Sequence, residues 1–324
     1  MTVRWGIAGP GAIAISFANG LQLLDDAEVY AVGSRSADRA KNFAAKYRAS
    51  ANYGSYEDLA NDPAVDAVYV ATPQSRHEQD TLMFLEAGKP VLCEKPFALS
   101  RAQAQRMVDV ARQRGVLLME AMWSRFLPAY RILAELLRNK AIGEPQLVEA
   151  DFGFHIPFDP NHRLYDPERG GGGLLDLGVY PVQFTSLVLG TPTSVAAQGR
   201  IGTSGVDEQV AAVLGYPGGK LAVVKAAIAA KLSSTARIAG TEGVIELPAP
   251  MHRPTSLVVI RGTDVEEIDS SWKGEGLRFQ VEEFHRCLAT GELESPVISH
   301  AETLSIMGTL DAIRSQIGLR FSGE

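Results

Sequence analysis

The stretch that decides the fold is residues 3–14, which read V-R-W-G-I-A-G-P-G-A-I-A. The apolar run Val3–Ala8 predicts a buried β-strand, and the next six residues, Gly9-Pro10-Gly11-Ala12-Ile13-Ala14, form a G-x-G-x-x-A pattern that opens a helical pattern over residues 13–24. The first glycine of such a turn makes it tight, and the second lets the backbone approach a pyrophosphate. The N-terminus of the helix then offers N–H groups and its positive dipole end to phosphates. We therefore predict a dinucleotide site with contacts from Gly9, Gly11, Ala12 and Ile13; the alternative is an ordinary glycine-rich turn.

The alternation of strand and helix continues beyond this turn. Strands are expected at residues 28–33, 66–71, 90–94 and 116–119, and helices at residues 37–46, 76–87 and 100–114. Strands that are covered by helices on both faces read as continuous apolar runs, and these largely do. The alternation is typical of βαβ units. It predicts a Rossmann dinucleotide-binding domain with a parallel sheet over residues 1–121.

The pattern changes after residue 121. Strands are expected at residues 146–156, 195–201, 209–216, 220–229, 234–239, 244–247 and 256–261, and helices at residues 128–139, 174–189, 277–289 and 300–316. Tyr216-Pro217-Gly218-Gly219 is typical of a hairpin turn between two of the strands. We predict a second α/β domain over residues 122–324 with a large, mostly antiparallel open sheet; its roles in substrate binding and oligomerisation are what the resemblance described below implies.

Composition excludes several classes of protein. The 324 residues fit two domains of roughly 100–200 residues each, and a formal net charge of −7 argues against a nucleic-acid partner. The two cysteines provide no disulfide framework, and the six histidines show no metal-ligand spacing with a carboxylate cluster, so we expect no metal. No run approaches the roughly 20 apolar residues of a membrane span, and the N-terminal residues lack a signal-peptide pattern. We expect a soluble, cytoplasmic protein.

The tip of the second strand bears on the choice of cofactor. An enzyme that uses NAD usually places a carboxylate there to accept from the ribose 2′-hydroxyl. This strand instead ends Gly33-Ser34-Arg35, Arg39 follows one turn into the next helix, and Asp38 comes later. Arginine pairs with a 2′-phosphate and stacks on adenine. The pattern favours NADP(H) bound by Ser34, Arg35 and Arg39; two solvated surface arginines would leave NAD open.

Two segments carry the candidate chemistry. Cys93-Glu94-Lys95-Pro96 follows the fourth strand, and ligands of open α/β sheets bind beyond the carboxyl ends of the strands. The Lys95 ammonium could stabilise a developing alkoxide there, unless it is a surface lysine. A glycine run, Gly170–Gly173, opens a helix on which Asp176 and Tyr180 are four residues apart and share a face. Tyr180 could then act as general acid/base, its ionised form favoured by Lys95, and Asp176 could orient the substrate or the lysine; an amphipathic helix with Tyr180 partly buried is the alternative.

Further candidates follow from their positions beside these segments. We expect the cofactor to contact residues after the third, fourth and fifth strands: Thr72, Pro73, His77, Glu94, Lys95, Trp123 and Arg125. We expect the substrate to contact one residue of the same region and several of a Pro/Asp-rich loop: Phe126, His155, Phe158 and Arg163, together with Tyr180. For His77 a surface position, and for the aromatic residues core packing, are the alternatives.

Taken together, the segments resemble the Gfo/Idh/MocA family, which includes glucose–fructose oxidoreductase and inositol dehydrogenase. The matching pieces are Gly9–Ala14, Thr72-Pro73-Gln74 with His77, Glu94-Lys95-Pro96, and Asp176 with Tyr180. The run from Glu120 to Pro128 and the Gly170–Pro181 segment resemble the branch of dimeric dihydrodiol dehydrogenases and D-xylose/NADP dehydrogenases. Two departures are Gln74, where many members have Asn, and Tyr180, where inositol-dehydrogenase-like members have His.

The resemblance implies an enzyme that moves a hydride between NADP, or NAD, and a CH–OH or C=O group of a sugar, polyol or trans-dihydrodiol. It implies that Lys95 and Tyr180 act at the reacting carbon. It also implies a homodimer or homotetramer formed through the open sheet. Two alternatives stay open: a glucose–fructose-type oxidoreductase that retains its cofactor, and a non-catalytic NADP-binding regulatory protein.

Overall fold

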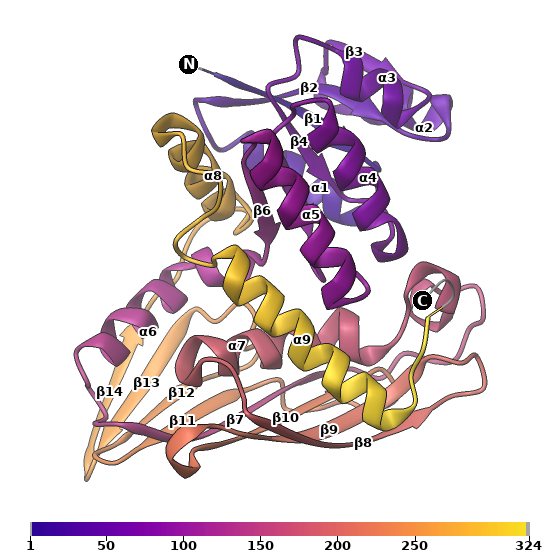
Figure 1. Cartoon of the computed structure of the whole chain (residues 1–324). Helices are drawn as coiled ribbons and strands as arrows, with labels where there is room; N and C mark the ends of the chain where they lie inside the picture. The colour runs from indigo at the N-terminus through magenta and orange to yellow at the C-terminus, as the bar shows by residue number, and fades with distance from the viewer. Residues whose placement is uncertain (1, 322–324) are drawn as a thin grey trace. The chain divides into compact units, whose positions relative to one another are not determined.

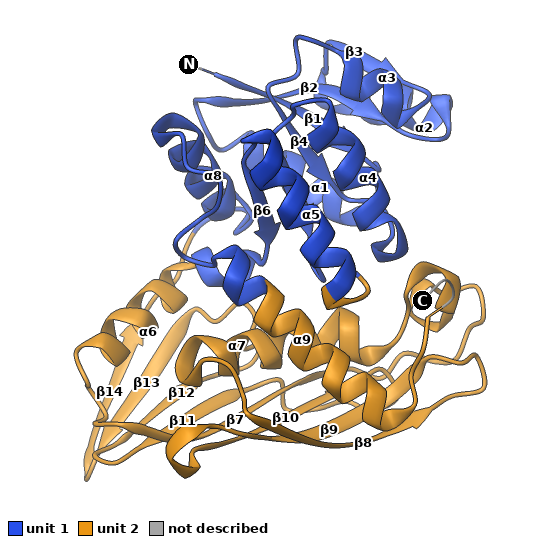
Figure 2. Ribbon diagram, in the orientation of Figure 1, with its two compact units in different colours: residues 1–98, 102–126, 273–303 blue, residues 99–101, 127–272, 304–324 orange. Residues whose placement is uncertain are grey.

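The computed structural model of the chain describes residues 2–321 (Figure 1). The chain forms two compact units (Figure 2). Unit 1 contains residues 2–98, 102–126 and 273–303, and unit 2 contains residues 99–101, 127–272 and 304–321. Unit 1 thus runs five residues past the single boundary that we predicted after residue 121, and it includes a late segment that we had assigned to the second domain.

The sheet of unit 1 is parallel throughout its six described strands. Its order is β3-β2-β1-β4-β5-β6, and every neighbouring pair is parallel. The strands are β1 Val3–Ala8, β2 Ala27–Gly33, β3 Ala51–Tyr53, β4 Ala67–Val70, β5 Val91–Glu94 and β6 Leu118–Ala121. This order reverses between β1 and β4, the point where dinucleotide-binding sheets hold their ligand. The predicted Rossmann domain is confirmed.

Helices cover this sheet and return the chain to its next strand. They are α1 Ala12–Leu21, α2 Ala37–Tyr47, α3 Tyr56–Asn61, α4 His77–Glu86, α5 Arg101–Arg114 and α8 Arg278–Thr290. The last one belongs here because its side chains contact β1. The Trp5 indole N–H donates to His285 Nε2 at 3.1 Å, and the Trp5 ring lies 4.8 Å from the Phe284 ring. This pairing explains why the segment from residue 273 packs with unit 1.

The sheet of unit 2 has eight described strands and is mostly antiparallel, as predicted. Its order is β14-β13-β12-β11-β7-β10-β9-β8, and only the central β7–β10 pair is parallel among the described strands. The strands are β7 Pro145–Gly153, β8 Ser194–Ile201, β9 Asp207–Gly215, β10 Leu221–Ala227, β11 Ala236–Gly240, β12 Val244–Leu247, β13 Ser256–Arg261 and β14 Asp264–Asp269. The short helix η6 Pro217–Gly219 joins β9 to β10, which confirms the predicted hairpin.

Helices lie on one face of this sheet only, within residues 2–321 (Figure 1). They are α6 Pro128–Arg138, α7 Val179–Leu189 and α9 His300–Ile317. Along β9 buried and exposed residues alternate, with Val213 43% exposed on the uncovered face. The alternation is that of an antiparallel sheet with one face on the core and one face open.

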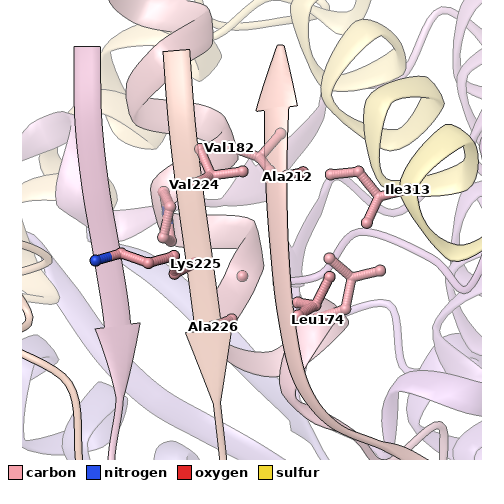
Figure 3. Close-up of a pocket in the computed structure, with 10 residues that line it drawn as sticks. Leu174, Val182, Ala212, Val224, Lys225, Ala226 and Ile313 are labelled. Atoms are coloured by element: carbon pink, nitrogen blue, oxygen red, sulfur yellow. The ribbon is translucent and has the colours of Figure 1, made fainter. Parts of the chain in front are cut away.

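A long apolar stretch crosses the covered face. Residues Pro167–Leu189 are long and apolar enough to cross a membrane by length and composition, but 78% of the most apolar 18-residue window in this stretch is buried inside the protein. Below it lies a cavity of about 10 Å³, lined by Leu174 and Val182 of the stretch, Ala212 of β9 and Val224 of β10 (Figure 3). A water needs roughly 10–15 Å³ and polar partners. This cavity is therefore a small packing gap under a core helix.

Candidate active site

The glycine turn after β1 has room for a ligand at one position. Gly9 has φ +91°, and a Cβ there would lie 2.8 Å from the carbonyl oxygen of Ala71, so only glycine fits this turn. At Gly11, the N-cap of α1, an added Cβ would meet no described atom within 4 Å. The N-terminus of α1 has no side-chain cap, and its Ile13 is 37% exposed. The turn therefore leaves backbone N–H groups open to an anion.

The tip of β2 places one arginine beside this turn. Arg39 Nη2 donates to the Pro10 carbonyl oxygen at 3.5 Å, and Ser36 caps α2 by accepting from Arg39 N. Arg35 is also exposed. Ser34, which we expected to contact the cofactor, is buried, and its Oγ accepts from Ser36 N at 3.2 Å. Its position favours shaping the loop over binding a ligand.

His77 lies behind the strand tips. Its ring is 2% exposed, and its two nitrogens lie 2.8 Å from the Pro96 carbonyl oxygen and 3.0 Å from the Thr72 carbonyl oxygen. Burial lowers the pKa of His77, while the two carbonyls oppose that shift. The imidazole thus joins the loop after β4 to the loop after β5, and this placement favours a positioning role instead of the direct cofactor contact that we predicted. Thr72 is buried, and Pro73 is exposed beside it.

Lys95 follows β5 and is partly exposed, with a cis peptide bond to Pro96. Glu94 below it is 5% exposed. The Glu94 carboxylate accepts from the Tyr69 hydroxyl at 2.5 Å and from Lys95 N at 3.2 Å. The Tyr69 ring stacks on Phe17 of α1 at 3.8 Å. Glu94 therefore ties the backbone of Lys95 to the core of unit 1, and its contact with the cofactor stays a prediction.

The short helix η2 Trp123–Phe126 contains three predicted contacts with different environments. Arg125 is 5% exposed, and its guanidinium pairs with the Glu302 carboxylate at 2.7 and 3.2 Å and donates to the Val297 carbonyl oxygen. Phe126 is fully buried. Trp123 is partly exposed. Arg125 thus joins η2 to the segment around Glu302, and the ligand contacts expected of Arg125 and Phe126 stay predictions.

Asp176 and Tyr180 lie on one continuous helical segment, as we predicted. The segment begins as a π-helix, η5 Leu174–Gly178, and continues as α7. Asp176 is 6% exposed, and both of its oxygens accept from the Arg163 guanidinium at 3.0 Å. Bidentate pairing of this kind fixes the orientation of a carboxylate. Arg163, a predicted substrate contact, thus holds Asp176 in this structure.

Tyr180 is surrounded by rings. Phe152 of β7 lies edge-on to it at 5.4 Å, and the imidazole of His252 lies 5.2 Å away. Sequence reasoning missed both residues: Phe152 follows the ordinary alternation of a strand, and His252 lies in a loop with no recognisable motif. The predicted substrate loop is exposed at His155 and at Phe158, whose ring contacts Tyr165 at 5.1 Å. Within residues 2–321 no group of three or more His, Cys, Asp or Glu side chains could hold a metal ion.

Comparison with known proteins gives the family. The family model described as "Oxidoreductase family, NAD-binding Rossmann fold" (GFO_IDH_MocA) matches residues 3–122, and the GFO/IDH/MocA C-terminal domain model matches residues 130–246. The chain belongs to the Gfo/Idh/MocA oxidoreductase family. The resemblance found in the sequence is therefore confirmed, and so are the prediction of an enzyme and the prediction of a nicotinamide-dinucleotide cofactor.

Relatives within the Gfo/Idh/MocA family cover the whole chain. The trans-1,2-dihydrobenzene-1,2-diol dehydrogenases of Xenopus tropicalis and Mus musculus are each 39% identical to it, over 99% of this chain and 100% and 98% of theirs. The crystal structure of KijD10, a 3-ketoreductase from Actinomadura kijaniata with NADP and TDP-benzene, is 28% identical with a TM-score of 0.88 and 98% coverage of both chains. An aldose–aldose oxidoreductase from Caulobacter crescentus, 24% identical over 98% of this chain and 97% of its own, shares the fold with a TM-score of 0.88.

The residues of unit 1 fit the cofactor that this family uses. The open side of Gly11 and the uncapped N-terminus of α1 suit a pyrophosphate, and the exposed Arg39 guanidinium lies beside the same turn. These observations come from the chain itself and are independent of the family match.

Proposed function

We propose that this protein is an NADP-dependent dehydrogenase of trans-dihydrodiols or sugars that interconverts a CH–OH group and a carbonyl. The observation that carries the proposal is the 39% identity, over nearly the full length of both chains, to trans-1,2-dihydrobenzene-1,2-diol dehydrogenases. The presence of Lys95 after β5 and of Asp176 and Tyr180 on one helix supports it.

Each catalytic residue has a role that its chemistry allows. The bound nicotinamide supplies or accepts the hydride. Lys95 donates a hydrogen bond to the reacting oxygen of the substrate and stabilises negative charge on it. Tyr180 exchanges the proton with that oxygen. Asp176, fixed by Arg163, orients the substrate, and the exposed loop with His155 and Phe158 selects it.

The preference for NADP over NAD belongs to the same proposal. Arg35 follows the tip of β2 and Arg39 lies in the first turn of α2, and both are exposed where a 2′-phosphate would extend from the adenosine ribose. No carboxylate occupies the strand tip itself, and Asp38 lies next to Arg39 in the first turn of α2. The NADP in the ketoreductase structure supports this choice by similarity.

Assembly and location complete the proposal. The uncovered face of the sheet of unit 2 exposes Val213 and Leu221, 43% and 44% exposed, on neighbouring strands. An exposed apolar sheet face suits a self-complementary interface, so we propose a homodimer or homotetramer through this face. Light scattering coupled to size-exclusion chromatography measures the oligomeric state, and a monomer would contradict the proposed assembly. A cytoplasmic location accords with the two unpaired cysteines, Cys93 and Cys287.

The test is a substrate screen that monitors nicotinamide absorbance. The screen compares trans-1,2-dihydrobenzene-1,2-diol, D-xylose, other sugars and polyols with NADP+ and with NAD+. On an accepted substrate, Lys95→Met and Tyr180→Phe should each lower turnover at least ~10²-fold, within the range for acid/base groups, while NADPH binding survives. Full turnover in either variant would remove that residue from the mechanism.

Two other functions make different predictions. A glucose–fructose-type enzyme would keep its nucleotide through dialysis, whereas the proposed dehydrogenase should lose it and regain activity when NADP+ is added back. A regulatory protein would bind NADPH and turn over none of the substrates. The retention of both Lys95 and Tyr180 disfavours the regulatory protein, since binding alone needs neither.

A further inference from the structure

A buried carboxylate lies at the start of the helical segment that carries Asp176 and Tyr180. Asp207, the first residue of β9, is fully buried, and its Oδ2 accepts from the backbone N–H of Leu174 at 2.6 Å. No basic side chain within residues 2–321 forms an ion pair with it. A buried carboxylate without a cation is costly, and the hydrogen bond from the Leu174 N–H offsets part of that cost, while Oδ1 accepts no hydrogen bond from the described residues.

The glycine run is shaped around this carboxylate. Gly172 has φ +119°, and a Cβ there would overlap Asp207 Oδ1. A Cβ on Gly173 would lie 3.4 Å from Asp207 Oδ2. The glycines that open the helix therefore make room for an internal anion. An external ligand would have to displace Asp207 to occupy the same N-terminus.

The first turn after this carboxylate has unusual geometry. Leu174–Gly178 is a π-helix, whose i→i+5 hydrogen bonds widen the turn. In an α-helix each residue turns by about 100°, so residues four apart are offset by about 40° around the axis. A wider turn rotates each residue less and changes that offset. Because Asp176 lies within the π-turn and Tyr180 lies two residues beyond it, the width of this turn sets the angle between the two side chains around the helix axis.

We propose that Asp207 is a positioning residue that caps the π-turn and thereby sets the positions of Asp176 and Tyr180 for the reaction. The inference rests on the proposed function only for the roles of those two side chains. Asp207 itself does not touch the substrate. Its contribution reaches the reaction through the Leu174 N–H, two residues before Asp176 and six before Tyr180.

The experiment compares three variants of the full-length protein. Asp207→Ala removes the acceptor, and Asp207→Asn keeps an amide oxygen that accepts from Leu174. Asp151→Ala is the control for loss of a buried carboxylate, because Asp151 is also buried in this sheet and also accepts a backbone N–H at 2.6 Å, but from Ser234. Asp151 differs from Asp207 in pairing with Lys225 at 3.2 Å. Amide hydrogen exchange over residues 170–189 reports the turn without any substrate. Turnover of trans-1,2-dihydrobenzene-1,2-diol with NADP+ and fluorescence titration with NADPH report function.

We expect Asp207→Ala to exchange amides of residues 174–180 at least ~10-fold faster and to lower kcat at least ~10-fold, with the Kd for NADPH within about twofold. Asp207→Asn should recover kcat to within about threefold of the unchanged protein. Asp151→Ala should leave both the amide exchange of residues 174–180 and kcat unchanged. Should Asp207→Ala fail to fold, Asp207→Ser replaces it, since the shorter side chain does not reach Leu174 N.

The inference is overturned if loss of the Asp207 side chain leaves exchange and kcat unchanged, if Asp207→Asn is as impaired as Asp207→Ala, or if Asp151→Ala reproduces the losses. If the unchanged protein turned over none of the substrates, that result would contradict the proposed function instead. The exchange experiment would still decide whether Asp207 holds the π-turn.

Discussion

Two glycine-rich turns open the two helices that matter for function, and they serve opposite purposes. The turn after β1 leaves Gly11 open on the side of its missing side chain, and the helix behind it has no side-chain cap. The run before η5 has its space filled by Asp207 of the same chain, which already bonds to the helix N-terminus. The first turn is built to receive an external anion, and the second turn contains its own.

The difference teaches how to interpret a glycine run. In both cases the glycines allow an anion to approach the start of a helix, since a Cβ would block it. Sequence alone shows the glycines but not where the anion comes from. The source decides whether the helix binds a cofactor, as we propose for α1, or has its side chains fixed in place, as we propose for the helix of Tyr180.

The largest expected effect comes from an added methyl group at the filled turn. Gly172→Ala should lower the free energy of unfolding by about 2–4 kcal/mol, because it combines a strained positive φ with displacement of a buried carboxylate. Chemical denaturation of the cofactor-free protein measures it. Gly205→Ala is the control, since Gly205 also has a positive φ of +87° but an added Cβ meets no described atom within 4 Å. Equal losses in the two variants would show that Asp207 does not occupy the turn.

A methyl group added at Gly11, in the turn after β1, should weaken cofactor binding without changing the stability of the protein. Gly11 has φ −97° and ψ −170°, which alanine adopts without strain. Gly11→Ala should therefore leave the unfolding free energy of the cofactor-free protein unchanged within about 0.5 kcal/mol. It should weaken NADPH binding about 10–100-fold, because the methyl group occupies the space of the pyrophosphate. Unchanged NADPH affinity by fluorescence titration would argue against this turn as the phosphate site.

Much of the fold follows from local patterns, and the misses have physical causes. Strand β4 was predictable because all four of its residues are apolar and buried, and β1 because its last four residues are apolar and buried. The three-residue β3 is too short to show a period, and the polar β14 is exposed at nearly every position. The π-turn is invisible in composition, because it depends on a carboxylate 33 residues further along the chain.

Sequence motifs pick out candidate residues of the site. They do not show which side chains contact each other across the fold. Gly11, Lys95 and Tyr180 lie within recognisable motifs. Arg125 was expected to bind the cofactor, but its partner Glu302 is 177 residues away and no local pattern reveals the pair. Glu94 and His77 turned inward for the same reason: their partners are Tyr69 and two backbone carbonyls.

The buried carboxyl group of Asp207 should also titrate, and its titration should change the stability of the protein. Burial raises the pKa of Asp207 from its ordinary value of 3.8 to about 7. The folded protein then keeps a proton that the unfolded chain has lost, so between about pH 4 and pH 7 this group makes stability fall as pH rises. Asp207→Asn has no proton to lose. Its unfolding free energy relative to the unchanged protein should rise by about 2–3 kcal/mol from pH 5 to pH 7.5, because each pH unit below the raised pKa corresponds to about 1.4 kcal/mol. A constant difference across that range would mean that Asp207 is ionised throughout.

The smallest expected effect tests which part of the cofactor binds beside the glycine turn after β1. Arg39→Ala removes an exposed guanidinium beside Pro10, and exposed charge contacts are weak, so the Kd for NADPH should rise only about 3–10-fold. The Kd for NADH should stay the same, because NADH lacks the 2′-phosphate. Arg35→Ala, measured in the same titrations, tells which arginine contributes more. The NADPH loss should shrink as salt rises from 50 to about 500 mM, because screening weakens an exposed ion pair. If the binding of NADPH and of NADH weakened equally at every salt concentration, Arg39 would be supporting the loop without contacting the 2′-phosphate.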